Sequence, residues 1–272
     1  MKCRLITGVS VENNIQNLKI KTFKIMENKT VIVTGASTGI GKAIAKLFIE
    51  KGSNVIMNSS NEDNLNATFE EFGFPENVIM VVGDISKKEV GEEIITRAVE
   101  KFRSIDVLVN NAGVFQPKPF LEVEDEDLNR FIDVNLKGTF FTSQAAVKQM
   151  ILQGSGSIIN IGTVLVDHAI AGFPATAAVS SKGAIHALTR QLAAEFGKDN
   201  IKVNTIAPGT IRSPLQGKIG VEDADSLAGL HLLNRIGEPE EIAEATYYLA
   251  AADFVTGETI NVAGGHTAGH SI

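Results

Sequence analysis

The sequence predicts one α/β domain built on a parallel sheet of about seven strands, with helices on both faces. From residue 31 onward, short runs rich in β-branched residues alternate with longer segments whose apolar residues recur every three or four positions. A chain of 272 residues that is 44% hydrophobic can bury one large core. No repeat, low-complexity tract or long linker divides it.

The expected elements follow from these patterns in chain order. Strands are expected at residues 31–34, 54–57, 78–82, 107–110, 157–161, 202–207 and 259–262. Helices are expected at residues 40–50, 64–72, 90–102, 127–153, 177–196 and 239–250, the last beginning with Pro239, which a first helical turn tolerates. Residues 212–237 carry little signal for either element, so this stretch is the candidate for a mobile flap over a site.

Composition and charge exclude several classes of function. A net charge of -7 offers no broad basic surface to nucleic acid or an anionic membrane, and no apolar run is long enough for a transmembrane helix. The single cysteine, Cys3, cannot form an internal disulfide, which suits the cytoplasm. Polar residues interrupt any signal-peptide core, so residues 1–28 are interpreted as an N-terminal extension, either a loose tail or a misassigned start. Residues 29–272 form the expected domain.

A glycine-rich sequence, TGASTGIG at residues 34–41, lies between the first expected strand and the first expected helix. Gly35 permits a tight turn, Gly39 lets backbone approach a pyrophosphate, and Gly41 lets the helix pack closely on the strand. The helix N-terminus offers free N–H groups and a favourable dipole to phosphates. The pattern predicts a dinucleotide-binding loop, although an ordinary strand-to-helix turn can have the same composition.

Further motifs follow in a fixed order: NNAG at residues 110–113, VNLKG at 134–138, APG at 207–209 and a closing segment at 237–265. Together with the glycine loop, they resemble the short-chain dehydrogenase/reductase family from about residue 30 to the C-terminus. The resemblance implies a Rossmann-type doubly wound sheet and hydride transfer between NADP(H) or NAD(H) and a small carbonyl or alcohol. It also implies a homodimer or homotetramer that pairs through the helices at 127–153 and 177–196, and it implies no metal.

The resemblance assigns cofactor contacts position by position. They are Gly35, Ser37, Thr38, Gly39, Ile40 and Gly41 at the diphosphate and adenosine ribose, Asp84 and Ile85 at the adenine, Asn111, Ala112 and Gly113 along the ribose, and Pro208, Gly209, Ile211 and Ser213 at the nicotinamide carboxamide. Asn110 and Asn111 also suit a turn after a strand.

The choice between NADP and NAD depends on the end of the second expected strand, where NAD-specific proteins usually present a carboxylate to the ribose 2′-hydroxyl. Here Asn58, Ser59 and Ser60 occupy the turn, so no carboxylate repels a 2′-phosphate, and no Arg or Lys attracts one. Glu62 and Asp63 follow, where acidic residues suit the first turn of a helix. The turn favours NADP slightly.

The catalytic residues that the resemblance implies are only partly present. The family uses a Ser to hold the carbonyl, a Tyr four residues before a Lys as acid or base, and an Asn to anchor a water relay. Lys182, which can also bind the nicotinamide ribose, and Asn135 match, and Thr163 takes the Ser position at a longer separation from Lys182. Ala178 stands where the Tyr is expected, while Tyr247 and Tyr248 lie in the last expected helix.

Loss of the phenol leaves the proton transfer open. Lys182 acting through a water could supply it, and so could His168, although a single His in a loop is more often incidental. The sequence therefore predicts an oxidoreductase, with an impaired dinucleotide-binding regulator or inactive partner subunit as the alternative and an altered lyase or isomerase as a third. Apolar residues at Ala169, Ile170, Phe173 and Leu215 indicate only that the substrate need not be highly charged.

Overall fold

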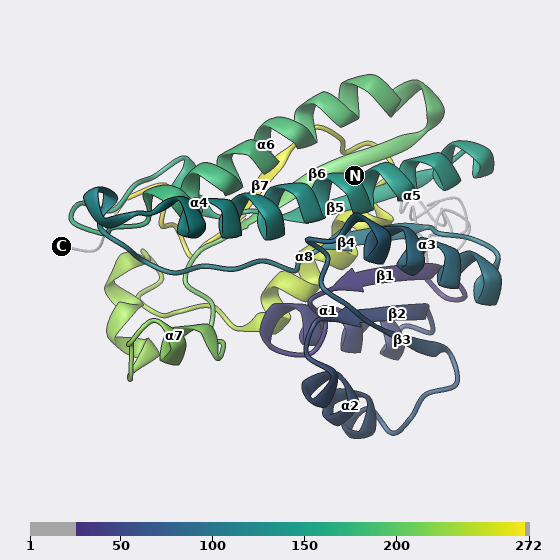
Figure 1. Cartoon of the computed structure of the whole chain (residues 1–272), viewed down its shortest axis with the longest axis horizontal. Helices are drawn as coiled ribbons and strands as arrows, with labels where there is room; N and C mark the ends of the chain where they lie inside the picture. Colours follow the sequence, from purple (N-terminus) through teal and green to yellow (C-terminus); the bar gives the residue numbers. More distant parts are fainter. Residues whose placement is uncertain (1–25, 270–272) are drawn as a thin grey trace, which may run out of the picture.

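The computed structural model describes residues 26–269, and residues 1–25 of the expected extension at 1–28 lie outside this range. The described strands form one sheet in the order β3-β2-β1-β4-β5-β6-β7, and every neighbouring pair is parallel (Figure 1). Their bounds are β1 Thr30–Thr34, β2 Asn54–Ser59, β3 Val78–Val82, β4 Val107–Asn110, β5 Gly156–Ile161, β6 Ile201–Pro208 and β7 Thr259–Val262. The order reverses beside β1, so the predicted doubly wound Rossmann fold is confirmed.

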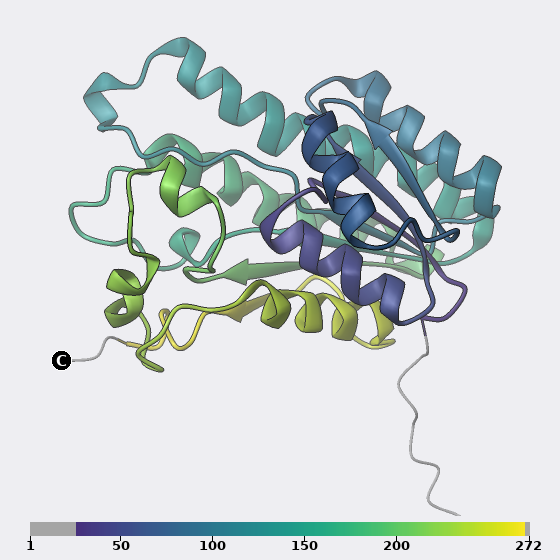
Figure 2. The same cartoon turned by 90° about the horizontal axis from the view of Figure 1, so that it is seen from below.

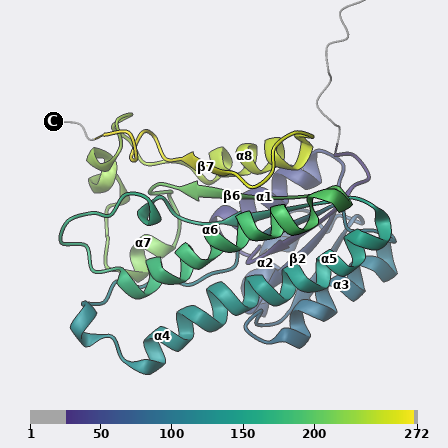
Figure 3. The ribbon, with the colours of Figure 1, turned by 90° about the horizontal axis from the view of Figure 1, so that it is seen from above.

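Alternating side chains of β1 supply two separate cores, one on each face of the sheet. Val31 and Val33 pack with α1 (Gly39–Glu50), α2 (Glu62–Glu71) and α8 (Pro239–Ala251), while Ile32 packs with α3 (Lys88–Phe102), α5 (Thr139–Gln153) and α6 (Thr176–Phe196). Figures 2 and 3 show these two helical layers from opposite sides. Met26 is buried in the first core. In the part of the chain that the structure describes, no helix has the length and apolar character needed to span a bilayer.

The helix expected at 127–153 is divided into three parts, which corrects that prediction. α4 (Asp125–Phe131) passes into a π-helical turn at Ile132–Gly138 before α5 begins. The turn buries Asn135 and Gly138 rather than a run of apolar side chains, so hydrophobic periodicity does not mark where it begins and ends. The turn contains Asn135, which is fully buried.

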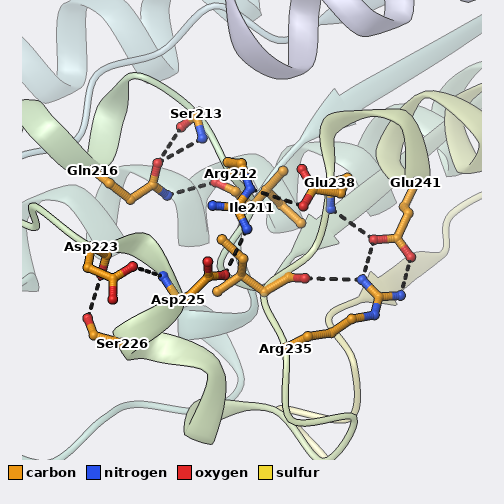
Figure 4. Close-up of polar contacts among 11 residues, drawn as sticks. Ile211, Arg212, Ser213, Gln216, Asp223, Asp225, Ser226, Arg235, Glu238 and Glu241 are labelled. Carbon is orange, nitrogen blue, oxygen red and sulfur yellow. Dashed lines mark hydrogen bonds and ion pairs between the residues drawn. The ribbon is translucent and has the colours of Figure 1, made fainter.

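Residues 212–237 are largely irregular, as predicted, but they hold α7 (Leu215–Lys218) and a 3-10 segment at Ala224–Leu230. Ion pairs fix both ends of this stretch (Figure 4). Arg212 contacts Asp225 at 2.7 Å and Glu238 at 3.0 Å, and Arg235 contacts Glu241 at 2.6 Å. The Arg235 guanidinium lowers the pKa of Glu241 to about 2. Exposed pairs stabilise a fold little, so their main effect is to orient the segment.

Candidate active site

The loop between β1 and α1 has the geometry of a phosphate site. Gly35 and Gly39 have φ angles of 65° and 52°, which side chains rarely adopt, and a Cβ at Gly41 would lie 2.2 Å from the carbonyl oxygen of Gly35. Thr38 at the N-cap of α1 makes no side-chain capping bond, and no acidic residue stands in the first turn. The N–H groups and positive dipole end of α1 are therefore available to an anion, which fits a diphosphate.

A second loop, after β4, holds this glycine loop in place. Asn111 Nδ2 donates to the carbonyl oxygens of Thr34 at 2.9 Å and Gly35 at 3.1 Å. Thr34 Oγ1 accepts from the backbone N–H groups of Asn111 at 3.1 Å and Ala112 at 3.0 Å. The Asn111 side chain is thus committed to the loop, which supports the turn interpretation of the NNAG motif alongside its place beside a cofactor.

A long cleft of about 590 Å³ runs from the glycine loop over the ends of β2, β3 and β4. Most of the predicted cofactor residues line it: Gly35, Ser37, Thr38, Gly39, Ile40, Gly41, Asn58, Ser59, Ser60, Asp84, Ile85, Asn111, Ala112, Gly113 and Ser213. Sequence reasoning missed other lining residues, of which Arg130 on α4 is cationic. No local pattern marks Arg130, because only the fold brings α4 to the cleft.

Two residues of the turn that is expected to distinguish NADP from NAD, Asn58 and Ser59, have different surroundings. Asn58 is buried, and its Nδ2 donates to the carbonyl oxygens of Val81 and Gly83, each at 3.0 Å. The Asn58 side chain thus joins β2 to β3. A carboxylate at this position would face two carbonyl oxygens, so the position is poorly suited to select a cofactor. Ser59 Oγ lies 2.9 Å from Ser37 Oγ of the glycine loop, which makes Ser59 the better candidate.

A second cavity, of about 340 Å³, adjoins the cleft and shares Ile40, Ser213 and Leu215 with it. Its lining is mainly apolar, and none of the described side chains that line it belongs to Asp, Glu, Lys or Arg. The lining residues are Ile40, Phe115, Thr163, Val164, Leu165, Ile170, Phe173, Pro208, Gly209, Thr210, Ile211, Ser213, Leu215, Gln216, Ile219, Val221, Leu227, Leu230 and His266. Pro208, Gly209 and Ile211 of the predicted nicotinamide site are among them, whereas Ala169 of the expected pocket is not.

Lys182 and Asn135 meet beside Gly113. Lys182 Nζ donates to the carbonyl oxygen of Ile161 at 2.6 Å, and burial lowers the pKa of its ammonium to about 8. A Cβ at Gly113 would lie 3.2 Å from Lys182 Nζ and 3.0 Å from Asn135 Oδ1, so the absent side chain leaves room for both.

Both hydrogens of the Asn135 amide are used within the protein. Nδ2 donates to Ser181 Oγ at 2.8 Å and to the Val114 carbonyl oxygen at 3.1 Å, while Oδ1 accepts from Val114 N–H at 2.8 Å. The Asn135 side chain therefore joins the π turn, the loop after β4 and α6. Its amide has no hydrogen left with which to orient a water.

Comparison with known proteins identifies the family. A family model described as enoyl-(acyl carrier protein) reductase, of the short-chain dehydrogenase type, matches residues 35–267. The chain belongs to the short-chain dehydrogenase/reductase family. It is 36% identical to the 3-oxoacyl-(acyl-carrier-protein) reductase FabG of Thermotoga maritima, over 88% of this chain and 98% of that protein.

Two further relatives differ from this reductase in the function that their names give. A 3alpha-hydroxysteroid dehydrogenase of Mediterraneibacter gnavus is 36% identical, over 89% of this chain and 98% of its own. The crystal structure of a short-chain type dehydrogenase/reductase from Mycobacterium marinum has a TM-score of 0.84 at 30% identity, covering 90% of this chain and 97% of its own. Family membership implies an NAD(P) cofactor.

Position 178, four residues before Lys182, is closed to solvent. Ala178 packs with Phe131 and Ala177, and Val114, Phe115 and Val123 pack against this group. The position at which the family resemblance places a tyrosine is therefore surrounded by apolar side chains. Thr163 lines the cavity and caps the turn at Val164–Val166, where its Oγ1 accepts from Leu165 N–H at 3.3 Å. Its hydroxyl hydrogen remains available to a substrate oxygen.

His168 lies on the loop after β5. Its backbone N–H donates to the Val164 carbonyl oxygen at 2.9 Å, and its half-buried ring does not line the cavity. The ring meets that of His266 edge-on, with centroids 5.4 Å apart, and His266 does line the cavity. Sequence reasoning missed His266, because it follows the last strand outside every motif. Within residues 26–269, no group of three or more His, Cys, Asp or Glu side chains is placed to hold a metal ion.

Proposed function

We propose that this chain is an NADP(H)- or NAD(H)-dependent oxidoreductase acting on an uncharged, largely apolar alcohol or ketone. The observation that carries the proposal is the junction of the dinucleotide cleft with the apolar cavity at Ile40, Ser213 and Leu215. A nicotinamide ring held at this junction would face the cavity that contains Thr163. The described side chains of the cavity lining include no Asp, Glu, Lys or Arg, which disfavours a charged substrate because a buried charge without a partner is costly.

The residues of the chain take distinct roles in this proposal. When bound, the cofactor supplies or accepts the hydride. Thr163 donates its hydroxyl hydrogen to the substrate oxygen, and Lys182 holds the nicotinamide ribose hydroxyls. Burial brings the pKa of Lys182 to about 8, so its ammonium is mostly charged at neutral pH and can also pass a proton to a bound water.

Ala178 favours a second candidate, a dinucleotide-binding regulator or inactive partner subunit. Its methyl group supplies no proton donor, and the side chains that pack around it are apolar. Direct titration with NADPH and NADH, combined with a screen of apolar ketones and alcohols, distinguishes the two. Turnover of any of these substrates supports the enzyme, whereas cofactor binding without turnover across the screen supports the regulator.

Ser59→Asp is expected to change the cofactor preference. A carboxylate at the end of β2, next to Ser37, would accept hydrogen bonds from the ribose 2′-hydroxyl and repel a 2′-phosphate. We expect the affinity ratio to shift about tenfold or more toward NADH, which isothermal titration calorimetry measures. Glu62→Gln is the control, since Glu62 is exposed and does not line the cleft. A shift in the control, or none in Ser59→Asp, would reassign the selecting residue.

The outer face of α5 and α6 supports the proposal of a homodimer or homotetramer. A shallow apolar groove of about 500 Å³ lies between these helices. It is lined by Leu136, Lys137, Phe140, Phe141, Ala184, Ala187, Leu188 and Gln191. Exposed apolar surface on paired helices is typical of an interface between identical subunits, and these helices are the ones expected from the resemblance.

A further inference from the structure

Ser213 lies where the cofactor cleft and the apolar cavity meet, at the beginning of the irregular stretch at residues 212–237. A Cβ at Gly39 would lie 3.2 Å from Ser213 Cβ, so the serine lies over the phosphate loop. The family resemblance assigns Ser213 to the nicotinamide carboxamide, which has a carbonyl oxygen that accepts and an NH2 group that donates. A serine hydroxyl can donate or accept, so the atom that it would contact depends on where its own hydrogen points.

The side-chain amide of Gln216 is held by two backbone groups, which fix its orientation (Figure 4). Its Oε1 accepts from Ser213 N–H at 2.8 Å, and its Nε2 donates to the carbonyl oxygen of Ile211 at 2.7 Å. Exchange of the amide oxygen and nitrogen would lose both bonds, so only one orientation fits. Gln216 is 7% exposed and lines the apolar cavity, so water competes little for this amide.

The carbonyl oxygen of Ile211 gives the amide a fixed reference point. Ile211 is buried and forms a parallel bridge with Gly237. Arg212 N–H donates to the Gly237 carbonyl oxygen at 2.8 Å, and Gly237 N–H donates to the Thr210 carbonyl oxygen at 2.9 Å. The backbone of residues 210–212 is therefore held against the segment that leads into α8, and the Gln216 side chain takes its position from this backbone.

The same amide decides the direction of the Ser213 hydroxyl. Ser213 Oγ lies 3.1 Å from Gln216 Oε1, and because an amide oxygen only accepts, the hydroxyl must donate its hydrogen to it. Leu215 N–H donates to one lone pair of Ser213 Oγ at 3.3 Å, and the second lone pair is left for a ligand. Ser213 Oγ can therefore accept a hydrogen bond from a ligand in the cleft, but its own hydrogen is already used.

We propose, on the basis of the proposed function, that Gln216 is a positioning residue that makes Ser213 an acceptor for the NH2 group of the nicotinamide carboxamide. The carboxamide is then held by its donor and not by its carbonyl oxygen, which selects one of the two planar orientations of this group. A dinucleotide whose ring substituent has no N–H donor would leave the Ser213 lone pair unpaired, so it would bind less tightly.

Calorimetric titration with NAD and with its 3-acetylpyridine analogue tests this role, because the analogue has a methyl ketone in place of the carboxamide. We expect the wild type to bind NAD about threefold to tenfold more tightly, as one hydrogen bond allows. Gln216→Met frees the hydroxyl to donate to the ketone oxygen, and Ser213→Ala removes the hydroxyl, so each should make the two affinities nearly equal. The double variant should change the ratio no further, since Gln216 acts through Ser213. Gln216→Glu keeps an acceptor oxygen and should keep the preference.

Gln153→Met is the matched control for the loss of an amide held by backbone. Gln153 Oε1 accepts from Ile105 N–H and its Nε2 donates to the Ile105 carbonyl oxygen, each at 2.9 Å, and neither residue lines the cofactor cleft. This variant should lose stability as Gln216→Met does, because both lose two hydrogen bonds to the backbone. Its ratio of affinities for NAD and the analogue should match that of the wild type.

The outcomes separate this inference from the proposed function. Equal affinities in the wild type, an unchanged ratio in Gln216→Met, or a changed ratio in Gln153→Met overturns the role of Gln216, while turnover of an alcohol by the wild type would still support the oxidoreductase. If the wild type binds NAD but oxidises no alcohol in the screen, the proposed function fails and the affinity ratios still decide the role of Gln216. If no dinucleotide binds, both fail.

Discussion

Gly39→Glu is expected to abolish measurable binding of NADPH and NADH while the fold remains intact. Gly39 begins α1 with a φ of 52°, and a Cβ there would lie 3.2 Å from Ser213 Cβ. The new side chain would enter the phosphate path with a negative charge, where the helix dipole and free N–H groups otherwise attract an anion. Calorimetric titration is expected to show a loss of affinity of about a hundredfold or more.

Gly73→Glu is the matched control for backbone strain and charge. Gly73 has a φ of 78°, and a Cβ there would meet no atom within 4 Å. The two variants should lose similar amounts of stability, on the order of 1–2 kcal/mol for a side chain in the left-handed region, but only Gly39→Glu should lose the cofactor. Full affinity in Gly39→Glu would place the dinucleotide elsewhere and remove the basis of the proposed function.

Ala178→Tyr is expected to destabilise the protein without restoring a faster reaction. The alanine is 1% exposed, and Phe131, Phe115 and Val114 surround it. A phenol ring introduced there would overpack this group, at a cost of about 1–3 kcal/mol in the free energy of unfolding. Chemical denaturation measures the loss, and steady-state kinetics are expected to show turnover no higher than that of the wild type.

The double variant Ala178→Tyr with Phe115→Ala separates crowding from chemistry. Removing the Phe115 ring frees volume next to position 178, so most of the lost stability should return. If Ala178→Tyr alone raises kcat by about a hundredfold at unchanged stability, the pocket is an impaired form of the usual family site. That outcome would contradict the view that apolar packing has closed the position.

Local sequence patterns predicted much of the fold, because the start and end of a helix or strand depend mainly on residues that are close in the sequence. The strands at Val78–Val82, Val107–Asn110 and Thr259–Val262 were predicted with the observed bounds, and most other elements differ from the prediction by a few residues at their ends. The π turn at Ile132–Gly138 was missed because the residues that it buries, Asn135 and Gly138, give hydrophobic periodicity no signal of its bounds. Most of the predicted cofactor residues line one cleft, since they belong to loops that follow strands in one parallel sheet, and cofactor binding there stays a prediction.

The sequence by itself determined the α/β class, the glycine loop and the positions of Lys182, Thr163 and Ala178, because each depends on short-range spacing. Only the tertiary structure decided that Asn58 faces the carbonyls of β3, and that His266 rather than His168 lines the apolar cavity. These features arise where segments distant in the chain pack together. Which side of a loop faces a cavity depends on that packing, and no local periodicity encodes it.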